Sequence, residues 1–318
     1  MNRPGATRVA TPGATPGATD NIALAVATIC FAVFALSLGD ALIKRVSAQF
    51  GLSQLFVLRS LLAAPILIAA MRLGFPDARL APKALGWTTV RSLMLTLMWV
   101  LYYLSLPQLD LSTAAATYYA APLFITLFSA LLIGERVRPL GWFAVVLGFL
   151  GVLLILRPQA GDFNAYALAP LGSAVLYALA MILTRTRCRG EHPLTLSLAL
   201  NVSFITVGCA LAGIGALLEL SVGAGSEGWR GALLSPWTGV DADGWVVIAI
   251  LAAGILIGSV GAAIAYQLAP PPVVATFDFA YIGFAVIWGV VFFAEAPDAI
   301  AIVGMLLIVL GGALALRR

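Results

Sequence analysis

The sequence predicts an all-α integral membrane protein whose ten transmembrane helices form two inverted five-helix repeats. Of the 318 residues, 62% are hydrophobic and only 10% are charged. The mean hydropathy of +1.03 lies far outside that of a soluble domain. Ten apolar segments are close to the roughly 20 residues that cross a hydrocarbon core. The apolar segment at 111–139 also returns in altered form at 273–298, which indicates a duplication.

The predicted helices use nearly the whole chain and fall into two groups of five. The first group spans 21–42, 52–71, 85–105, 112–133 and 139–157, and the second spans 165–184, 194–218, 244–268, 273–294 and 299–316. Residues 1–20 repeat PGAT and contain no apolar core, so we expect a disordered cytoplasmic tail rather than a signal peptide. The connections are too short for a soluble catalytic domain, and we expect no enzyme activity.

The two repeats, 21–157 and 165–316, align at two offsets. Glu135 precedes Glu295 by 160 positions, whereas Arg59 precedes Asn201 by 142, and the 18-residue difference is an insertion. It falls in a predicted outer loop at 219–243. Because each repeat has an odd number of helices, the second repeat enters the membrane inverted relative to the first. Such halves suit alternating access, so the pattern predicts a transporter.

Lysine and arginine residues predict the orientation, because cytoplasmic loops retain positive charge. With the amino terminus inside, twelve of these residues lie on the inner side and four lie outside, namely Lys44, Arg45, Arg157 and Arg230. We therefore expect a multi-pass protein of the inner (plasma) membrane with both termini in the cytoplasm. This topology accounts for the net charge of +4 without a nucleic-acid partner.

Four charged side chains are expected within the bilayer, where a charge is costly unless it is paired or serves a pathway. By depth they form two candidate pairs, Asp40 with Arg59 toward the outer side and Arg91 with Asp278 toward the inner side. Each pair has two interpretations, a structural ion pair that holds helices in register or a part of the transport pathway. For Asp40 and Arg59 the structural interpretation is favoured.

Asp278 is the better functional candidate. The duplication places this acid where the first repeat has Tyr118, and Tyr281 follows about one helical turn later on about the same face. A carboxylate at this depth is expected either to bind a substrate ammonium group or to accept a coupling proton. The sequence leaves both roles open, and a direct ion pair with Arg91 would argue against both.

Aromatic residues near the centre of the predicted helices are expected to line a substrate cavity. Aromatic walls supply apolar contact, cation–π attraction and hydroxyl groups for small amphipathic solutes. Tyr102 and Tyr103, near the outer end of the third helix, fit an interfacial belt as well as a cavity. The predicted cavity residues are Trp99, Tyr118, Tyr119, Tyr177, Asp278 and Tyr281.

Other features receive structural interpretations. Pro122 is expected to kink the fourth helix, and its aligned residue is Ile282, so the kink is predicted in the first repeat alone. Glu135 and Glu295 each lie near a membrane surface, where the dipole of the following helix stabilises a carboxylate. The small-residue pattern at Gly254 and Gly258 is typical of close helix packing. Three scattered cysteines suggest neither a disulfide framework nor a metal site.

Several motifs together resemble the drug/metabolite transporter superfamily in its EamA-type, ten-helix branch. They are FALSLGDALIKR, FVLRSLL, Arg91 at the start of the third helix, AAPLFITLFSALLIGERV and SAVLYALAMILTRTR, and the resemblance covers about 21–316. It implies a secondary carrier for small organic metabolites, commonly amino acids or related compounds, with a central cavity and no ATP-binding element. The second repeat departs from the pattern at AEAPD, where the first has GERVRP.

These observations lead to one preferred function and two alternatives. The preferred function is a secondary active transporter of a small organic metabolite, marginally favoured as an exporter of amino acids or related zwitterions. The first alternative is an uptake carrier for a vitamin-like or nucleoside-like metabolite, of the riboflavin or S-adenosylmethionine type. The remote alternative is an intramembrane lipid-acting enzyme. The expected partners are the substrate, the lipid bilayer and a candidate coupling proton, the expected assembly is a monomer or homodimer, and no cofactor is expected.

Overall fold

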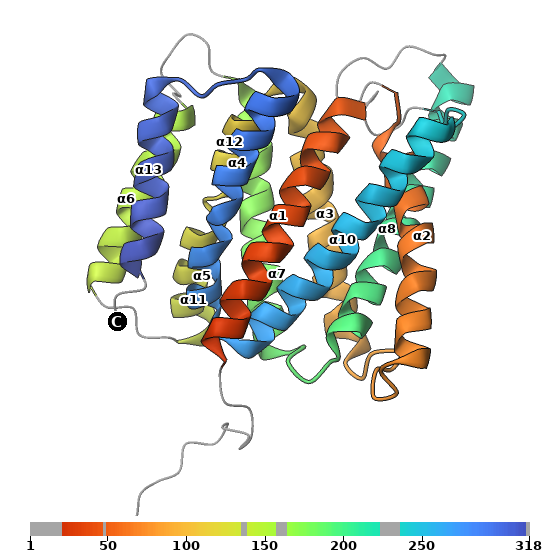
Figure 1. Ribbon diagram of the computed structural model, residues 1–318, viewed down its shortest axis with the longest axis horizontal. Helices are drawn as coiled ribbons and strands as arrows, with labels where there is room; N and C mark the ends of the chain where they lie inside the picture. Colours follow the sequence, from red (N-terminus) through yellow and green to blue (C-terminus); the bar gives the residue numbers. More distant parts are fainter. Residues whose placement is uncertain (1–20, 47–48, 135–138, 157–163, 223–235, 316–318) are drawn as a thin grey trace, which may run out of the picture.

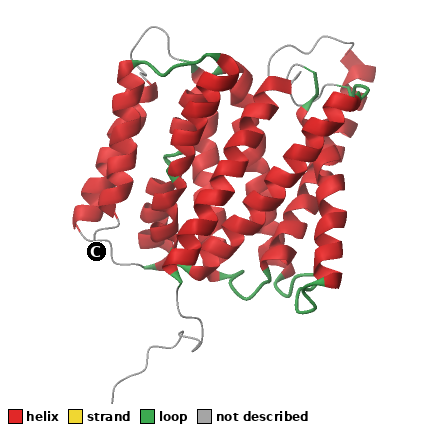
Figure 2. Ribbon diagram, viewed as in Figure 1, coloured by secondary structure: helices red, strands yellow, loops and turns green. Residues whose placement is uncertain are grey.

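The structure is a computed structural model that describes residues 21–46, 49–134, 139–156, 164–222 and 236–315. Within these ranges the chain is helical and has no strand, as Figure 2 shows. The predicted tail at 1–20, Glu135, Arg157 and residues 223–235 of the predicted outer loop lie outside the described residues.

The helices follow the predicted segments closely, although α8 extends into the predicted outer loop. In the first half they are α1 (Ile22–Val46), α2 (Leu52–Leu73), α3 (Leu85–Ser105), α4 (Leu111–Tyr118), α5 (Ala121–Phe128) and α6 (Pro139–Leu156). In the second half they are α7 (Leu168–Thr186), α8 (Pro193–Val222), α10 (Ala242–Leu268), α11 (Pro271–Asp278), α12 (Ala280–Phe293) and α13 (Ala299–Ala315). A π-helical turn, η2 (Ser129–Ile133), follows α5, and the short 3₁₀ turns η1 (Leu106–Gln108) and η3 (Ala165–Ala167) precede α4 and α7.

Eight helical segments of the described chain are long and apolar enough to cross a membrane. The apolar parts of α6 and α13 are shorter. Their outward faces carry large apolar side chains; Phe31, Leu131 and Val291 are each more than 60% exposed. Exposed apolar area on this scale marks a surface that meets lipid or another apolar partner. Helices suit that environment because they satisfy their backbone hydrogen bonds internally.

Four helix pairs organise the bundle: α1 with α10, α2 with α8, α3 with α7, and α6 with α13. Figure 1 shows α6 and α13 side by side at the left edge of the molecule. Small residues permit these close approaches. A β-carbon on Gly304 would lie 2.8 Å from the backbone oxygen of Gly151, and Gly258 of α10 faces the side chain of Leu36 on α1. The small-residue pattern therefore serves packing within the chain.

Two helical segments are interrupted at equivalent positions. The fourth predicted helix breaks between Tyr118 and Ala121, and the ninth breaks at Phe279, which aligns with Tyr119 at the offset of 160. Pro122 lies in the first turn of α5, where its missing N–H costs little. The prediction of a kink in the first repeat alone is wrong, because the second break forms without a proline. There the backbone tightens, and the Ile282 N–H donates to the Phe279 carbonyl at 3.0 Å.

Candidate functional site

A cavity lies inside the bundle where both halves of the chain meet. Its volume is about 40 Å³, enough for only a few water molecules, since one water needs roughly 10–15 Å³. Helices from residues 21–156 and from residues 164–315 both contribute to its wall. All six residues predicted for a cavity line it, and so do Asp40, Arg91 and Tyr102.

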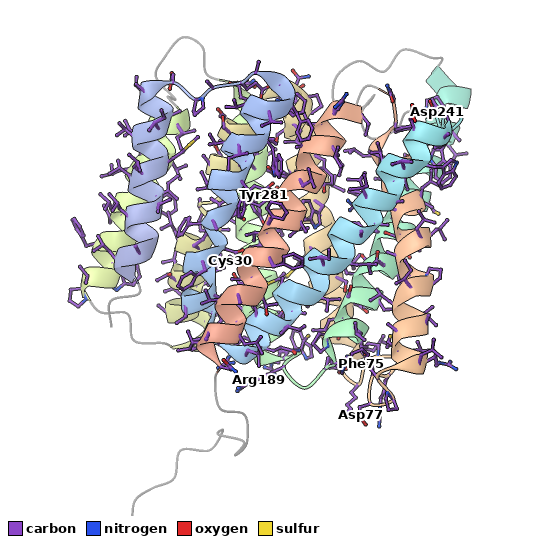
Figure 3. All side chains as sticks on the ribbon, in the orientation of Figure 1. Cys30, Phe75, Asp77, Arg189, Asp241 and Tyr281 are labelled. Carbon is purple, nitrogen blue, oxygen red and sulfur yellow. The ribbon has the colours of Figure 1, made fainter. Side chains whose placement is uncertain are left out.

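Asp40 projects from α1 and is almost fully buried, with 2% of its surface exposed. The Tyr103 hydroxyl of α3 donates to Asp40 Oδ1 at 3.1 Å, and the Tyr281 hydroxyl of α12 donates to Oδ2. Tyr281 lies within the bundle close to α1, as Figure 3 shows. Asp40 therefore receives hydroxyl groups from both halves of the chain.

Asp278 is equally buried, with 2% of its surface exposed, but its partners come from the second half alone. The Tyr177 hydroxyl of α7 donates to Asp278 Oδ2 at 3.0 Å, and the Tyr266 hydroxyl of α10 donates to the same oxygen at 2.7 Å. Asp278 is also the last residue of α11, directly before the helix break. Sequence reasoning missed Tyr266. Its one signal was its position near the end of α10, which the short turn at Ala269 and Pro270 connects to α11.

Neither predicted intramembrane ion pair forms directly among the described residues. The salt bridge recorded there joins Lys44 and Glu295 instead. Arg59 reaches Asp40 only through Tyr103, whose hydroxyl accepts from Arg59 Nη1 at 3.3 Å and donates to the carboxylate. Arg59 forms no direct ion pair because its guanidinium carbon lies over the Phe56 and Phe204 rings, 4.9 and 4.5 Å from their centroids.

Arg91 also lacks the predicted carboxylate partner. Its Nε donates to Thr184 Oγ1 at 2.5 Å, and its Nη1 is buried with no hydrogen-bond partner among the described residues. The side chain is 1% exposed and lines the cavity. Asp278 therefore forms no direct ion pair with Arg91 among the described residues, and such a pair would have argued against a transport role.

Tyrosine and tryptophan rings form a continuous wall on the cavity. Tyr119 stacks on Tyr281 with ring centroids 4.9 Å apart, and Tyr118 contacts Tyr102 and Tyr177 at 5.3 and 5.7 Å. Tyr102 and Tyr103 are 1% and 3% exposed. An interfacial belt therefore does not describe them, since both are inside the bundle and Tyr102 lines the cavity.

Asn201 and Glu295 do not line the cavity. Asn201 donates to the Ser197 carbonyl one turn earlier in α8, at 2.9 Å. Glu295 binds Lys44 Nζ at 2.6 Å and accepts from the Leu111 N–H at 3.0 Å. It therefore caps α4, whereas the sequence pointed to the helix that follows Glu295. A structural role is consistent with both contacts.

A helical membrane bundle with an internal cavity that is lined by acids, an arginine and aromatic rings from both halves has the architecture of a transporter. Residues 23–157 match the EamA-like transporter family. This match and the relatives named as transporters support the resemblance to EamA-type transporters of the drug/metabolite transporter superfamily that the motifs indicated. The chain's named relatives are transporters, which confirms that its role is transport rather than enzyme catalysis.

This chain resembles transporters that are named for different substrates. The pseudopaline exporter CntI of Pseudomonas aeruginosa is 28% identical over 282 residues, covering 87% of this chain and 90% of the relative. A riboflavin transporter of Brucella anthropi is 26% identical over 196 residues, or 61% and 63% of the two chains. A crystal structure of another protein matches with a TM-score of 0.63 at 19% identity, covering 93% of this chain and 96% of the other, and shows a shared fold.

Proposed function

We propose that this protein is a secondary active transporter that moves a small organic metabolite across the inner (plasma) membrane by alternating access. One observation carries the proposal: a cavity inside the bundle is lined by both halves of the described chain, with Asp40 and Asp278 in its wall. Buried acids inside membrane proteins mark substrate or ion pathways. Export of amino acids or related zwitterions is the favoured reaction.

The proposed architecture is ten spans in two inverted repeats, and the helix contacts support it. If the repeats are exchanged, α1 maps onto α7 and α10 maps onto α3, so the α1–α10 pair becomes the α7–α3 pair. The α2–α8 and α6–α13 pairs map onto themselves. The equivalent breaks at Tyr119 and Phe279 fit the same exchange. At about 1.5 Å per residue, the 18 residues of α6 extend for about 27 Å, near the thickness of a hydrocarbon core.

The orientation is proposed with both termini in the cytoplasm. In Figure 1, α1 begins and α13 ends at the same end of the bundle. Arg189 lies at this end, and Asp241 lies at the opposite end, as Figure 3 shows. An excess of positive charge at the end that holds the termini is the pattern expected of a cytoplasmic face.

The cavity residues Trp99, Tyr118, Tyr119, Tyr177 and Tyr281 are proposed to contact the substrate. A volume of about 40 Å³ is too small for an amino acid, so the bundle must widen when it loads. The breaks before α5 and before α12 offer positions where backbone rotation can open the wall, because broken helices line many transporter sites.

Asp278 is proposed as the coupling residue. When deprotonated, its carboxylate accepts hydrogen bonds from Tyr177 and Tyr266 and can bind a substrate ammonium group. When protonated, it loses that charge and releases the ammonium group, so proton binding and amine binding compete at one site. Such competition couples solute movement to a proton gradient.

An uptake carrier for a vitamin-like or nucleoside-like metabolite is the second candidate. The aromatic wall supports it, because stacked tyrosines contact a heterocycle as well as an amino acid. A relative named as an S-adenosylmethionine uptake transporter from Rickettsia prowazekii, 28% identical over 74 residues, or 23% of this chain and 25% of the relative, also favours it, as does the riboflavin transporter.

Transport by purified protein in proteoliposomes tests the proposal. The panel contains labelled amino acids, nucleosides and vitamins, measured with and without an imposed pH gradient, and compares the unmodified protein with Asp278→Asn. Asp77→Asn, in a loop at one end of the bundle, is the matched control. We expect saturable, gradient-driven flux that loses its pH response only in Asp278→Asn. Equal behaviour of all three proteins would show that Asp278 is structural, and absence of saturable flux would contradict the carrier.

A further inference from the structure

Arg91 is the one basic residue that lines the described cavity. Thr184 holds it through Nε at 2.5 Å, which fixes the guanidinium plane and leaves Nη1 without a partner among the described residues. Arg59, the other buried arginine, has unpartnered nitrogens too, but aromatic rings cover it and it does not line the cavity. Arg91 is therefore the cation that a solute in the cavity meets.

A buried guanidinium with a free N–H group is uncommon, because buried polar groups nearly always have hydrogen-bond partners. Two carboxylates share the cavity with Arg91, yet neither forms a salt bridge with it among the described residues. Asp40 and Asp278 instead accept hydrogen bonds from tyrosine hydroxyls. The cavity thus keeps one positive and two negative groups apart, each available to a ligand group of opposite charge.

The depths of these groups suggest how a ligand would lie. Arg91 is six residues beyond the start of α3, and Asp278 is seven beyond the start of α11, which places both about 10 Å from the same end of the bundle at 1.5 Å per residue. The Tyr177 hydroxyl donates to Asp278, and Tyr177 lines the same cavity as Arg91. Asp40 is 18 residues beyond the start of α1, toward the opposite end.

We propose that Arg91 binds a carboxylate of the transported solute while Asp278 binds its ammonium group, so that the substrate is an amino-carboxylate. The remainder of the solute extends along the tyrosine wall toward Asp40. A guanidinium pairs with a carboxylate through two parallel N–H donors, and Arg91 Nη1 supplies one donor that no described residue uses. The inference rests on the proposed function, because it assigns this cavity as the transport site.

A solute without a carboxylate leaves Arg91 unpaired, so the site should select against it. This requirement separates amino-carboxylate solutes, S-adenosylmethionine included, from solutes without a carboxylate. Amino acids satisfy it, whereas a neutral heterocycle such as riboflavin offers no carboxylate to the guanidinium. The cavity chemistry thus favours the amino-carboxylate substrate over the vitamin-like one.

The test compares matched solutes that differ in one group. Proteoliposomes containing the unmodified protein, Arg91→Gln or Arg91→Lys are assayed with three sets of labelled compounds: phenylalanine, phenylalaninamide and phenethylamine; lysine, lysinamide and cadaverine; and riboflavin. Arg59→Gln is the matched control, because it removes a buried arginine outside the cavity. The readout is the ratio of kcat/KM for each acid to that for its amide, which a general loss of folding does not change.

We expect the unmodified protein to prefer at least one acid over its amide, and Arg91→Gln to lower that preference roughly 10- to 100-fold. Arg91→Lys should retain part of it, and Arg59→Gln should leave the ratio unchanged. An unchanged ratio in Arg91→Gln, or flux of riboflavin and amides but of no acid, overturns the carboxylate assignment while the transporter stands. Absence of saturable flux for every compound overturns the proposed function and this assignment together.

Discussion

Asp40 and Asp278 occupy one cavity, are equally buried and each accept two tyrosine hydroxyls, yet their surroundings differ. The tyrosines on Asp40 come from both halves of the chain, and one of them leads on to Arg59. The tyrosines on Asp278 come from the second half, and none of the described contacts connects them to a cation by hydrogen bonds. Asp40 thus links the two halves, whereas Asp278 is placed at a helix break where its partners can change.

This difference suggests a division of labour between the two acids. A carboxylate linked to a buried guanidinium holds helices in place, because removing either group leaves the other without compensation. A carboxylate held by neutral hydroxyl groups is free to exchange a proton or an ammonium ion. The predictions below test this division, from the largest expected effect on stability to the smallest.

The largest effect on stability is expected at Asp40. Asp40→Asn leaves the Arg59 charge uncompensated, so we expect the free energy of unfolding to fall by about 1–3 kcal/mol. Asp278→Asn should lower it by less than about 1 kcal/mol, because its neutral partners can also bond an amide. Denaturant unfolding of the purified protein in detergent measures both. A larger loss of unfolding free energy in Asp278→Asn than in Asp40→Asn would contradict this division of labour between the two acids.

A second link between α1 and the second half lies one turn beyond Asp40. Lys44 binds Glu295 at 2.6 Å and the Leu109 carbonyl at 2.9 Å, with both charged side chains mostly buried. We expect Lys44→Gln or Glu295→Gln to cost about 1–2 kcal/mol. The exchanged pair, Lys44→Glu with Glu295→Lys, should recover part of that loss. If each single variant is as stable as the parent, this link does not hold the halves together.

The tyrosine hydroxyl groups sharpen the comparison further. Tyr281→Phe removes a donor to Asp40, and Tyr266→Phe removes a donor to Asp278. Each should cost about 1 kcal/mol, as for one buried hydrogen bond. The functional results should differ: Tyr266→Phe shifts the pH dependence of flux, and Tyr281→Phe leaves it in place. Initial rates of flux in proteoliposomes, measured over about three pH units around neutrality, distinguish the two variants.

The smallest effect is expected at Pro122. The aligned break before α12 forms without proline, and Pro122 lies in the first turn of α5, so Pro122→Ala should change stability by less than about 1 kcal/mol. Flux should stay within about twofold of the parent, since that change corresponds to a small shift in free energy. A large loss of flux would show that the proline itself makes the first break.

Much of this architecture could be read from the sequence because it depends on composition and length. The third predicted helix, 85–105, coincides with α3 (Leu85–Ser105), and the bounds of the apolar segments placed Trp99 and Tyr177 near the centre of their helices. The cavity residues could be predicted because central aromatic and charged residues are rare in such helices and have few places to go other than the interior.

Partners were harder to predict than positions. The predicted depths of Asp40 and Arg59 were close enough for an ion pair. Only the structure, in which α2 packs against α8, shows that the Arg59 guanidinium lies over aromatic rings. The bridge through the Tyr103 hydroxyl depends on how α3 is rotated about its own axis, and the depth of a residue in the membrane does not reveal that rotation. The break at Phe279 likewise has no proline beside it, and the alignment of Pro122 with Ile282 led to the prediction of a kink in the first repeat alone.

The most direct test of the account separates coupling from solute exchange in Asp278→Asn and Asp40→Asn. Counterflow of labelled phenylalanine against unlabelled phenylalanine is measured without a gradient, and net flux is measured with an imposed pH gradient, in the same proteoliposomes. The account predicts that Asp278→Asn, which lacks the charge that binds the ammonium group, exchanges phenylalanine only with a raised KM and no longer responds to the gradient, whereas Asp40→Asn keeps its gradient response in whatever protein remains folded. Gradient-driven flux that survives in Asp278→Asn, or disappears only in Asp40→Asn, would contradict it.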